Sequence, residues 1–141
     1  MSTNNLHIEG KHYDQIDIKI ISKELKKKAP LETFGFQEFT SEGEHWVIIS
    51  TPELTSICPF SDYPDFGSVE IRYVPNEKCL ELKSFKLYIN AFREVKIFHE
   101  SLTELIFHDF LETVQPKKAK ILVDMNVRGN VKTVCEKSYK C

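Results

Sequence analysis

The sequence predicts an α+β domain in which an antiparallel sheet carries two helices on one face. Strand-like patterns lie on both sides of a helical region, between residues 31 and 74 and again between 121 and 135. The two helical patterns, 84–94 and 99–114, follow each other directly. A parallel βαβ arrangement would need a helix after each strand, and this order does not supply one.

The first half of the chain predicts three strands. Aromatic and polar residues alternate over 31–39, and the run at 46–49 consists of Trp, Val and Ile, which favour strands. Turn-forming residues at 40–43 lie between them, so we expect these two strands to form a hairpin. Residues 67–74 place an apolar side chain at every second position, which predicts a half-buried strand.

Two amphipathic helices are expected next. In 84–94 apolar residues recur at i, i+3, i+4 and i+7, and Lys86 and Arg93 lie within about 60° of each other beside that stripe. The second helix is expected over 99–114, with capping-box spacing at 101–104, although it could begin a turn earlier. Alternating residues then predict a strand over 121–127, a turn at 128–130 and a last strand from 131 to 135.

Length and composition are those of one globular domain. The chain has 141 residues, of which 41% are hydrophobic and 28% charged. We expect a polar, solvated and partly disordered N-terminal arm over 1–30, which contains KELKKK, and a single domain over 31–141.

Charge and hydropathy exclude several partners. The net charge of −2 lacks the basic excess of a nucleic-acid module. No apolar run approaches the roughly 20 residues needed to cross a bilayer, and the N-terminus lacks the apolar region of a secretory signal. We therefore expect a cytoplasmic protein that binds neither nucleic acid nor a membrane.

The familiar metal and nucleotide patterns do not occur. The four cysteines form no CxxC pair, the five histidines form no HExxH pattern, and the five glycines are too widely spaced for GxGxxG or a Walker loop. The sequence predicts no metal site, and a nucleotide cofactor would have to bind without a Rossmann fingerprint.

Residues 56–67, SICPFSDYPDFG, are the first segment that could carry catalytic or binding groups. It contains a cysteine, two aspartates and two prolines without any periodicity, which is typical of a loop that presents functional groups. Cys58 would need a nearby base to act as a nucleophile, and Asp65 could accept or donate that proton. On the residues alone, a buried and unreactive Cys58 is favoured over a nucleophile.

Two further segments lie at predicted helix starts. Lys83, Lys86 and Arg93 would form either a solvated face with ion pairs or a grip for the phosphates of a cofactor. Next to His99, Glu100 would either favour the dipole of the following helix or accept hydrogen bonds from a purine-like base.

Taken together, three strings resemble the QueF family, the NADPH-dependent 7-cyano-7-deazaguanine reductases of the queuosine pathway. They are ICPFSDYPDFG at 57–67, ELKSFKLY at 81–88 and FHE at 98–100. The family's helix-entry motif is met at every position of 81–88, and the resemblance covers roughly 31–137. Residues 60–63 depart from the family's usual Lys/Val-Thr-Gly-Gln.

The resemblance implies a tunnelling fold, related to GTP cyclohydrolase I, in which sheets of several subunits join into a barrel. It implies a homo-oligomer, for which a decamer of two pentamers is one arrangement, with sites between subunits. The substrate would be a deazapurine nitrile, reduced with two NADPH per turnover and no metal.

The resemblance also implies a role for individual residues. Cys58 would form a covalent thioimide and Asp65 would donate the proton. Substrate binding would fall to Leu80, Glu81, Leu82, His99 and Glu100, and cofactor binding to Lys83, Lys86 and Arg93.

Two alternatives remain open at the level of sequence. One is a zinc-dependent hydrolase of the GTP cyclohydrolase type, which would need a Cys/His ligand set. The other is a non-catalytic subunit that binds a purine or a pterin.

Overall fold

Four long strands form one antiparallel sheet with the order β2–β3–β5–β6. The structure is a computed structural model that describes residues 16–141. A separate two-stranded sheet joins the short strands β1 and β4. The α+β class and the antiparallel pairing are as predicted. The strands are β1 (Thr33–Gly35), β2 (Val47–Ile57), β3 (Pro64–Val74), β4 (Lys78–Leu80), β5 (Lys118–Arg128) and β6 (Val131–Lys140).

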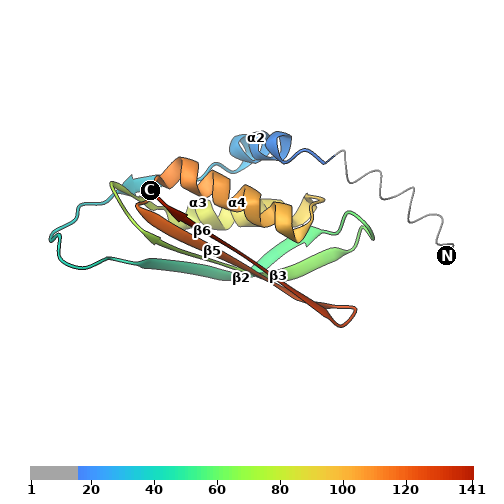
Figure 1. The fold of residues 1–141 in the computed structure, drawn as a ribbon. Helices are drawn as coiled ribbons and strands as arrows, with labels where there is room; N and C mark the ends of the chain where they lie inside the picture. Colours follow the sequence, from blue (N-terminus) through green and yellow to red (C-terminus); the bar gives the residue numbers. More distant parts are fainter. Residues whose placement is uncertain (1–15) are drawn as a thin grey trace.

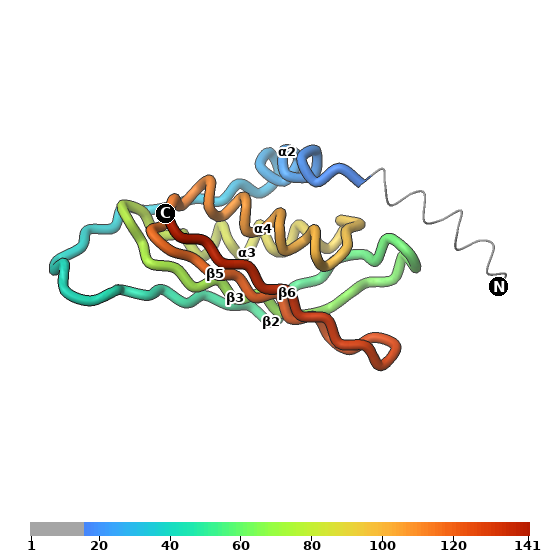
Figure 2. Tube along the Cα trace, in the orientation of Figure 1, coloured from blue at the N-terminus to red at the C-terminus, as the bar shows by residue number. Residues whose placement is uncertain are grey.

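The helices lie together on one face of the four-stranded sheet (Figure 1). Figure 2 shows α3 and α4 directly over the strands, while α2 lies further out, against α4. No helix within residues 16–141 is long and apolar enough to cross a membrane. The elements are α2 (Ile18–Lys28), α3 (Leu82–Asn90), the 3₁₀ helix η1 (Ala91–Glu94) and α4 (His99–Val114).

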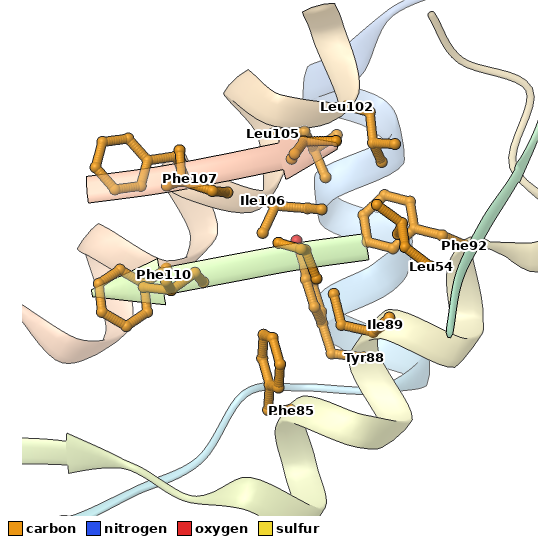
Figure 3. Packing of buried hydrophobic residues seen from close by; sticks show 14 of the residues in the cluster. Leu54, Phe85, Tyr88, Ile89, Phe92, Leu102, Leu105, Ile106, Phe107 and Phe110 are labelled. Atoms are coloured by element: carbon orange, nitrogen blue, oxygen red, sulfur yellow. The ribbon is translucent and has the colours of Figure 1, made fainter. Parts of the chain in front are cut away.

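The core lies between this helix layer and the sheet. Alternate residues of β3 and β5 face the helices and are fully or almost fully buried, as the alternating pattern predicted. From the helices, aromatic and aliphatic side chains point into the same space (Figure 3). The largest buried side chains include Tyr73, Tyr88, Phe92, Phe107, Phe110, Ile71, Ile89, Ile97 and Ile106.

The predicted hairpin between 31–39 and 46–49 is wrong. β1 pairs with β4, with Phe34 opposite Cys79, and β2 pairs with β3 on both sides of a bulge between Thr51 and Leu54. Turn residues at 40–43 mark where the chain bends, but they do not determine which strands pair. β2 and β3 have eleven residues each and can form a long ladder, whereas β1 has only three.

The segment 56–67 is a loop only in its middle. β2 continues to Ile57 and β3 begins at Pro64, so residues 58–63 alone connect the two strands. A proline is tolerated at the first position of a strand, because the missing N–H breaks no interior ladder bond.

The helix expected over 84–94 begins earlier and changes form near its end. Glu81 caps α3, the α-helix ends at Asn90, and residues 91–94 continue as the 3₁₀ helix η1. Arg93 is therefore not on the same continuous α-helix as Lys86, and the angle expected between them does not apply. The second helix has the predicted bounds, His99–Val114, and starts a turn before the capping-box residues.

The expectation of a solvated, partly disordered arm is wrong for α2. Asp17 caps this helix by accepting a hydrogen bond from the N–H of Lys19. Leu25 is buried in the core, and Ser22 donates a 2.6 Å hydrogen bond to Asp109 of α4. An apolar stripe among the lysines therefore docks the helix. Residues 1–15 lie outside the described part, and the domain boundary at residue 30 stays a prediction.

Candidate functional site

Asp65, the second residue of β3, lies at the centre of a polar group at one end of the sheet. Its side chain is buried, with 6% of the residue exposed. Oδ2 lies 3.1 Å from Nε2 of His99, the first residue of α4. Oδ1 forms an ion pair with the guanidinium of Arg128, the last residue of β5. Both carboxylate oxygens of Asp65 therefore have a partner from another element.

A tight hairpin turn places Arg128. Arg128 pairs with Val131 across a two-residue turn in which Gly129 has φ +58° and Asn130 has φ +67°. Positive φ at both central residues is typical of a type I′ turn, whose twist matches that of the strands. The end of β5 is thereby directed toward the start of β3.

Arg128 also holds the loop that carries the cysteine. Its guanidinium donates at 3.3 Å to the carbonyl oxygen of Pro64 and at 3.3 Å to Oγ of Ser61, and it lies 5.8 Å from the ring centroid of Tyr63. The sequence assigned Arg128 only to a turn, and no chemical pattern in the sequence indicated its contact with Asp65.

Cys58 begins a closed turn. Its N–H donates to the carbonyl of Tyr63 at 2.9 Å, and its own carbonyl accepts from the N–H of Asp62 at 2.9 Å. The thiol is free and the residue is half-buried. Asp62 has φ +62°, which lets the chain reverse within the few residues before β3. Cys58 and Asp65 therefore lie at the two ends of one short connection.

Residues 95–97, just before α4, form hydrogen bonds with the end of β2, next to the same turn. Ile57 donates to the carbonyl of Val95 at 2.9 Å and accepts from Ile97 at 3.1 Å, which makes a parallel bridge with Lys96. Nζ of Lys96 lies 2.8 Å from Asp62. The start of α4 is thus fixed beside the cysteine.

At this helix start, His99 and Glu100 differ in exposure. The His99 side chain is 20% exposed and contacts Asp65, whereas Glu100 is exposed in the first turn of α4. A carboxylate here is favoured by the helix dipole and still has its oxygens available to N–H donors. Asp65 and His99 are in contact, Cys58 is on the turn just before β3, and Glu100 follows His99 at the same helix start; their role as a site stays a prediction.

Residues 80–82 lie apart from the group around Asp65. Glu81 is the N-cap of α3, where its side chain accepts from the N–H groups of Lys83 and Ser84 at 2.8 Å each. These two hydrogen bonds lower the pKa of Glu81. The side chain of Leu80 is in the core, with 2% of the residue exposed, while Leu82 is exposed.

Within one chain, β4 ends one residue before Glu81 and lies by the carboxyl end of α4, whereas His99 begins that helix. Nζ of Lys78, three residues before Glu81, lies 3.4 Å from the carbonyl oxygen of Thr113 and 3.4 Å from Oε1 of Gln115, at the carboxyl end of α4. His99 begins that helix, and 16 residues at about 1.5 Å each separate its ends by about 24 Å. One chain therefore does not bring all of the expected substrate-binding residues into one site.

The three expected cofactor-binding cations are all exposed. Lys83 and Lys86 project from α3 and Arg93 from η1, and Lys86 and Arg93 form no ion pair within residues 16–141. Arg93 lines a hollow of about 320 Å³ together with Lys28 and Asn90. Free, exposed cations of this kind suit phosphate groups. Among the described residues, no three His, Cys, Asp or Glu side chains are placed to hold a metal ion.

Comparison with known families gives a match over the second half of the chain. The model of a family described as "QueF-like protein" matches residues 64–141. These residues include β3, both core helices and the β5–β6 hairpin, but not Cys58.

Three curated relatives each have the name NADPH-dependent 7-cyano-7-deazaguanine reductase. The Prochlorococcus marinus (strain NATL2A) protein is 50% identical over 91 residues, which are 64% of this chain and 65% of the relative. The Gloeothece citriformis (strain PCC 7424) protein is 48% identical over 99 residues, 70% of this chain and 72% of the relative. The Chloroherpeton thalassium (strain ATCC 35110 / GB-78) protein is 40% identical over 110 residues, 78% of this chain and 93% of the relative. The match thus spans just under two thirds of the first relative.

A solved structure has the same architecture. The crystal structure of the archaeosine synthase QueF-Like in the apo form superposes with a TM-score of 0.63 and 24% identity, covering 69% of this chain and 95% of that chain. At this identity the likeness shows the fold alone.

Proposed function

The chain belongs to the QueF-like family and has its tunnelling fold, and from this premise we propose that it reduces 7-cyano-7-deazaguanine to 7-aminomethyl-7-deazaguanine with NADPH. This reaction belongs to queuosine biosynthesis, and we place it in the cytoplasm. The observation that carries the proposal is the group formed by the Cys58 turn, the buried Asp65 and His99.

Cys58 is the proposed nucleophile. A nitrile carbon is electrophilic, so the thiolate adds to it and forms a C–S bond while one π bond of the nitrile opens. The nitrogen takes up a proton, and the product is a covalent thioimide. Nothing leaves in this step, because addition only converts the triple bond into a double bond.

Asp65 is the proposed proton donor for the nitrile nitrogen. It lies across the turn from Cys58, and its contacts with His99 and Arg128 orient the carboxyl group. Protonation by a positioned group typically contributes 10²–10⁴-fold to a rate. His99 can return the proton to Asp65, since it lies within hydrogen-bonding distance.

Two hydride equivalents from two NADPH complete the reduction. The first converts the thioimide carbon to a tetrahedral centre from which the Cys58 thiolate departs, leaving an imine. The second reduces the imine, and two protons balance the overall conversion of nitrile to primary amine. Lys83, Lys86 and Arg93 are the proposed contacts for the cofactor's phosphates, because they are exposed on one stretch of chain.

Glu100 and His99 are the proposed contacts for the deazaguanine ring on the chain that supplies Cys58. Glu81, with the backbone of Leu80 and with Leu82, would come from a neighbouring subunit, because within one chain it lies at the opposite end of the helix layer. A homo-oligomer with sites between subunits accounts for both positions.

The edges of the sheet support such an assembly. β2 and β6 are edge strands of 11 and 10 residues, and neither has a second partner strand within residues 16–141. Long open edges offer rows of main-chain donors and acceptors to another strand. Leu82 and Leu87 add exposed apolar area, with 60% and 51% of each residue exposed.

Nitrile-dependent oxidation of NADPH tests the activity. We expect the absorbance of NADPH to fall only when 7-cyano-7-deazaguanine is present, with two NADPH consumed per amine formed. NADH serves as the cofactor control. Oxidation that is independent of the nitrile, or amine formation without oxidation of NADPH, would contradict the proposal.

Mixing two inactive variants tests the shared site. Equal amounts of Cys58→Ala chains and Glu81→Ala chains, unfolded together and reassembled, should recover ~25% of the wild-type activity. In about a quarter of the interfaces, a chain with an intact Cys58 meets a chain with an intact Glu81. If Glu81 served the Cys58 of its own chain, no mixed interface would be intact and no activity would return.

A further inference from the structure

Ser56 is a buried hydroxyl without a hydrogen-bond partner. The residue has 0% of its surface exposed, and its Oγ is the one buried side-chain polar atom within residues 16–141 that lacks a partner. A buried hydroxyl with no partner destabilises the folded state, since it has lost its hydrogen bonds to water. Such a group therefore requires an explanation other than stability.

Its place in the sheet links it to the proposed proton donor. Ser56 lies directly opposite Asp65 in the pairing of β2 with β3. Side chains of directly opposite residues point to the same face, with Cβ atoms about 4.5–5.5 Å apart. Cys58 is two residues further along the chain, so Ser56 neighbours both the proposed nucleophile and the proposed acid.

The carboxyl group of Asp65 has no spare oxygen in this arrangement. Oδ1 is held by Arg128 and Oδ2 by His99. A protonated, neutral carboxyl group is held less strongly by both partners, so one of these two contacts loosens when Asp65 carries the proton toward a ligand. The protein then needs another group to hold the carboxyl while its protonation changes.

A serine hydroxyl suits that task. It donates to a carboxylate and accepts from a carboxylic acid, and it changes between the two by rotation of its O–H. A change of rotamer about Cα–Cβ can direct Oγ toward the residue opposite. Arg128 can only donate, and Nε2 of His99 changes from donor to acceptor only when its own protonation or tautomer changes.

We propose that Ser56 is a positioning residue for Asp65: its hydroxyl bonds the carboxyl group when Asp65 releases His99 or Arg128 to protonate the ligand. The inference rests on the proposed function, because it assigns Ser56 a part in the same proton transfer. It acts through Asp65 and does not contact the ligand.

The test compares Ser56→Ala with wild type in two measurements. The melting temperature should be equal or higher, because the variant no longer buries an unpaired hydroxyl. The turnover number for nitrile-dependent NADPH oxidation should fall on the order of 10–10²-fold, the scale expected when a catalytic group is misplaced, while the KM for the nitrile stays near its wild-type value.

Ser22→Ala is the matched control. Ser22 is also a buried serine, and it also faces an aspartate, but its hydroxyl already bonds Asp109 at 2.6 Å and lies outside the site. Its removal should lower the melting temperature and leave turnover unchanged. Ser56→Thr keeps the hydroxyl and should retain more turnover than Ser56→Ala.

The pH profile separates a role in proton transfer from a role in packing. Asp65 is faced by His99 from α4 and by Arg128 from β5, and the Cys58 thiol is on the turn that follows β2, so the profile reports this group as a whole. Ser56→Ala should change its shape, and a change in packing alone should lower turnover equally at all pH values. If the wild type is active and Ser56→Ala has normal turnover and an unchanged pH profile, this inference alone is overturned. A wild type without nitrile-dependent oxidation overturns the proposed function and this inference with it.

Discussion

Nε2 of His99 lies 3.1 Å from Oδ2 of Asp65, and this contact joins the first residue of α4 to the start of β3. The two residues are 34 positions apart in the chain. The contact directs the imidazole toward the carboxyl group and sets it beside the cysteine turn. The same contact makes Asp65 the residue through which the sheet and the helix layer meet at the site.

A covalent adduct on Cys58 is the first expected outcome. Protein incubated with 7-cyano-7-deazaguanine and no NADPH should gain the full mass of the nitrile, because thiolate addition expels nothing. Peptide mapping by mass spectrometry should place the adduct on Cys58 and not on Cys79, Cys135 or Cys141. Cys58→Ala should bind the nitrile, gain no mass and oxidise no NADPH. Reduction of the nitrile by this variant would rule out covalent catalysis by Cys58.

Asp65→Asn should lower turnover by about 10²–10⁴-fold, because the amide keeps the shape of the side chain but cannot donate the carboxyl proton. NADPH oxidation measures the loss, and binding of the nitrile should persist. Asp124→Asn is the control: it makes the same change on β5, where Asp124 pairs with Lys132 away from the site. Near-normal turnover in Asp65→Asn would transfer the proton role to another group, and His99 would be the first to test.

Glu100→Gln should weaken binding of the deazaguanine by about 1–3 kcal/mol, because the neutral amide is a poorer acceptor for the N–H groups of the ring. Calorimetry on the Cys58→Ala background measures binding without chemistry. Glu104→Gln, one turn further along α4, removes a charge that pairs with Lys137 and should leave affinity unchanged. If Glu100→Gln and Glu104→Gln bind the deazaguanine equally tightly, Glu100 does not contact the ligand.

Tyr88→Phe should lower the free energy of unfolding by about 1–3 kcal/mol. The hydroxyl of Tyr88 donates a 2.6 Å hydrogen bond to the buried Asp109, and without it one oxygen of that carboxylate loses its partner. Urea denaturation measures the change. Tyr139→Phe, on the partly exposed strand β6, should change stability by less than about 0.5 kcal/mol. Equal losses in the two variants would contradict a structural role for the bond between Tyr88 and Asp109.

Stability should fall at alkaline pH. Burial raises the pKa of Tyr73 to about 12, and burial and Asp109 raise the pKa of Tyr88 well above its ordinary value. The folded state therefore keeps protons that the unfolded chain releases above about pH 10, so this stability is complete below pH 10 and is lost as the pH rises toward 12. Urea denaturation between pH 8 and about 11 should show the decline, and Tyr73→Phe should make it shallower. A free energy of unfolding that stays constant to about pH 11 would contradict it.

Periodic patterns predicted the elements better than the pairing of strands. The helix His99–Val114 was predicted with its bounds, because its apolar residues repeat over four turns and a proline follows. The three-residue strands β1 and β4 are too short to show a period, and the sequence indicated neither β4 nor the partner of β1. α2 was missed because its lysines outnumber the few apolar residues that dock it.

The candidate site was predicted in part. Cys58, Asp65, His99 and Glu100 were proposed from short strings whose residue types and order resemble a known family, and their roles stay predictions. Arg128 and Ser56 were not proposed, because their place beside Asp65 depends on which residues lie opposite them. An arginine beside a turn and a serine in a strand are ordinary until the strands are paired.

The sequence by itself determined the α+β class, the core helices and the residue types available for the chemistry, since these depend on local periodicity and on the side chains themselves. Only the tertiary structure decided which of these residues meet. The pairing of β2 with β3 sets Ser56 opposite Asp65, the turn after β5 brings Arg128 to the same carboxylate, and the length of α4 keeps Glu81 away from it. Strand register and helix length act between residues far apart in the chain, and no local pattern encodes those distances.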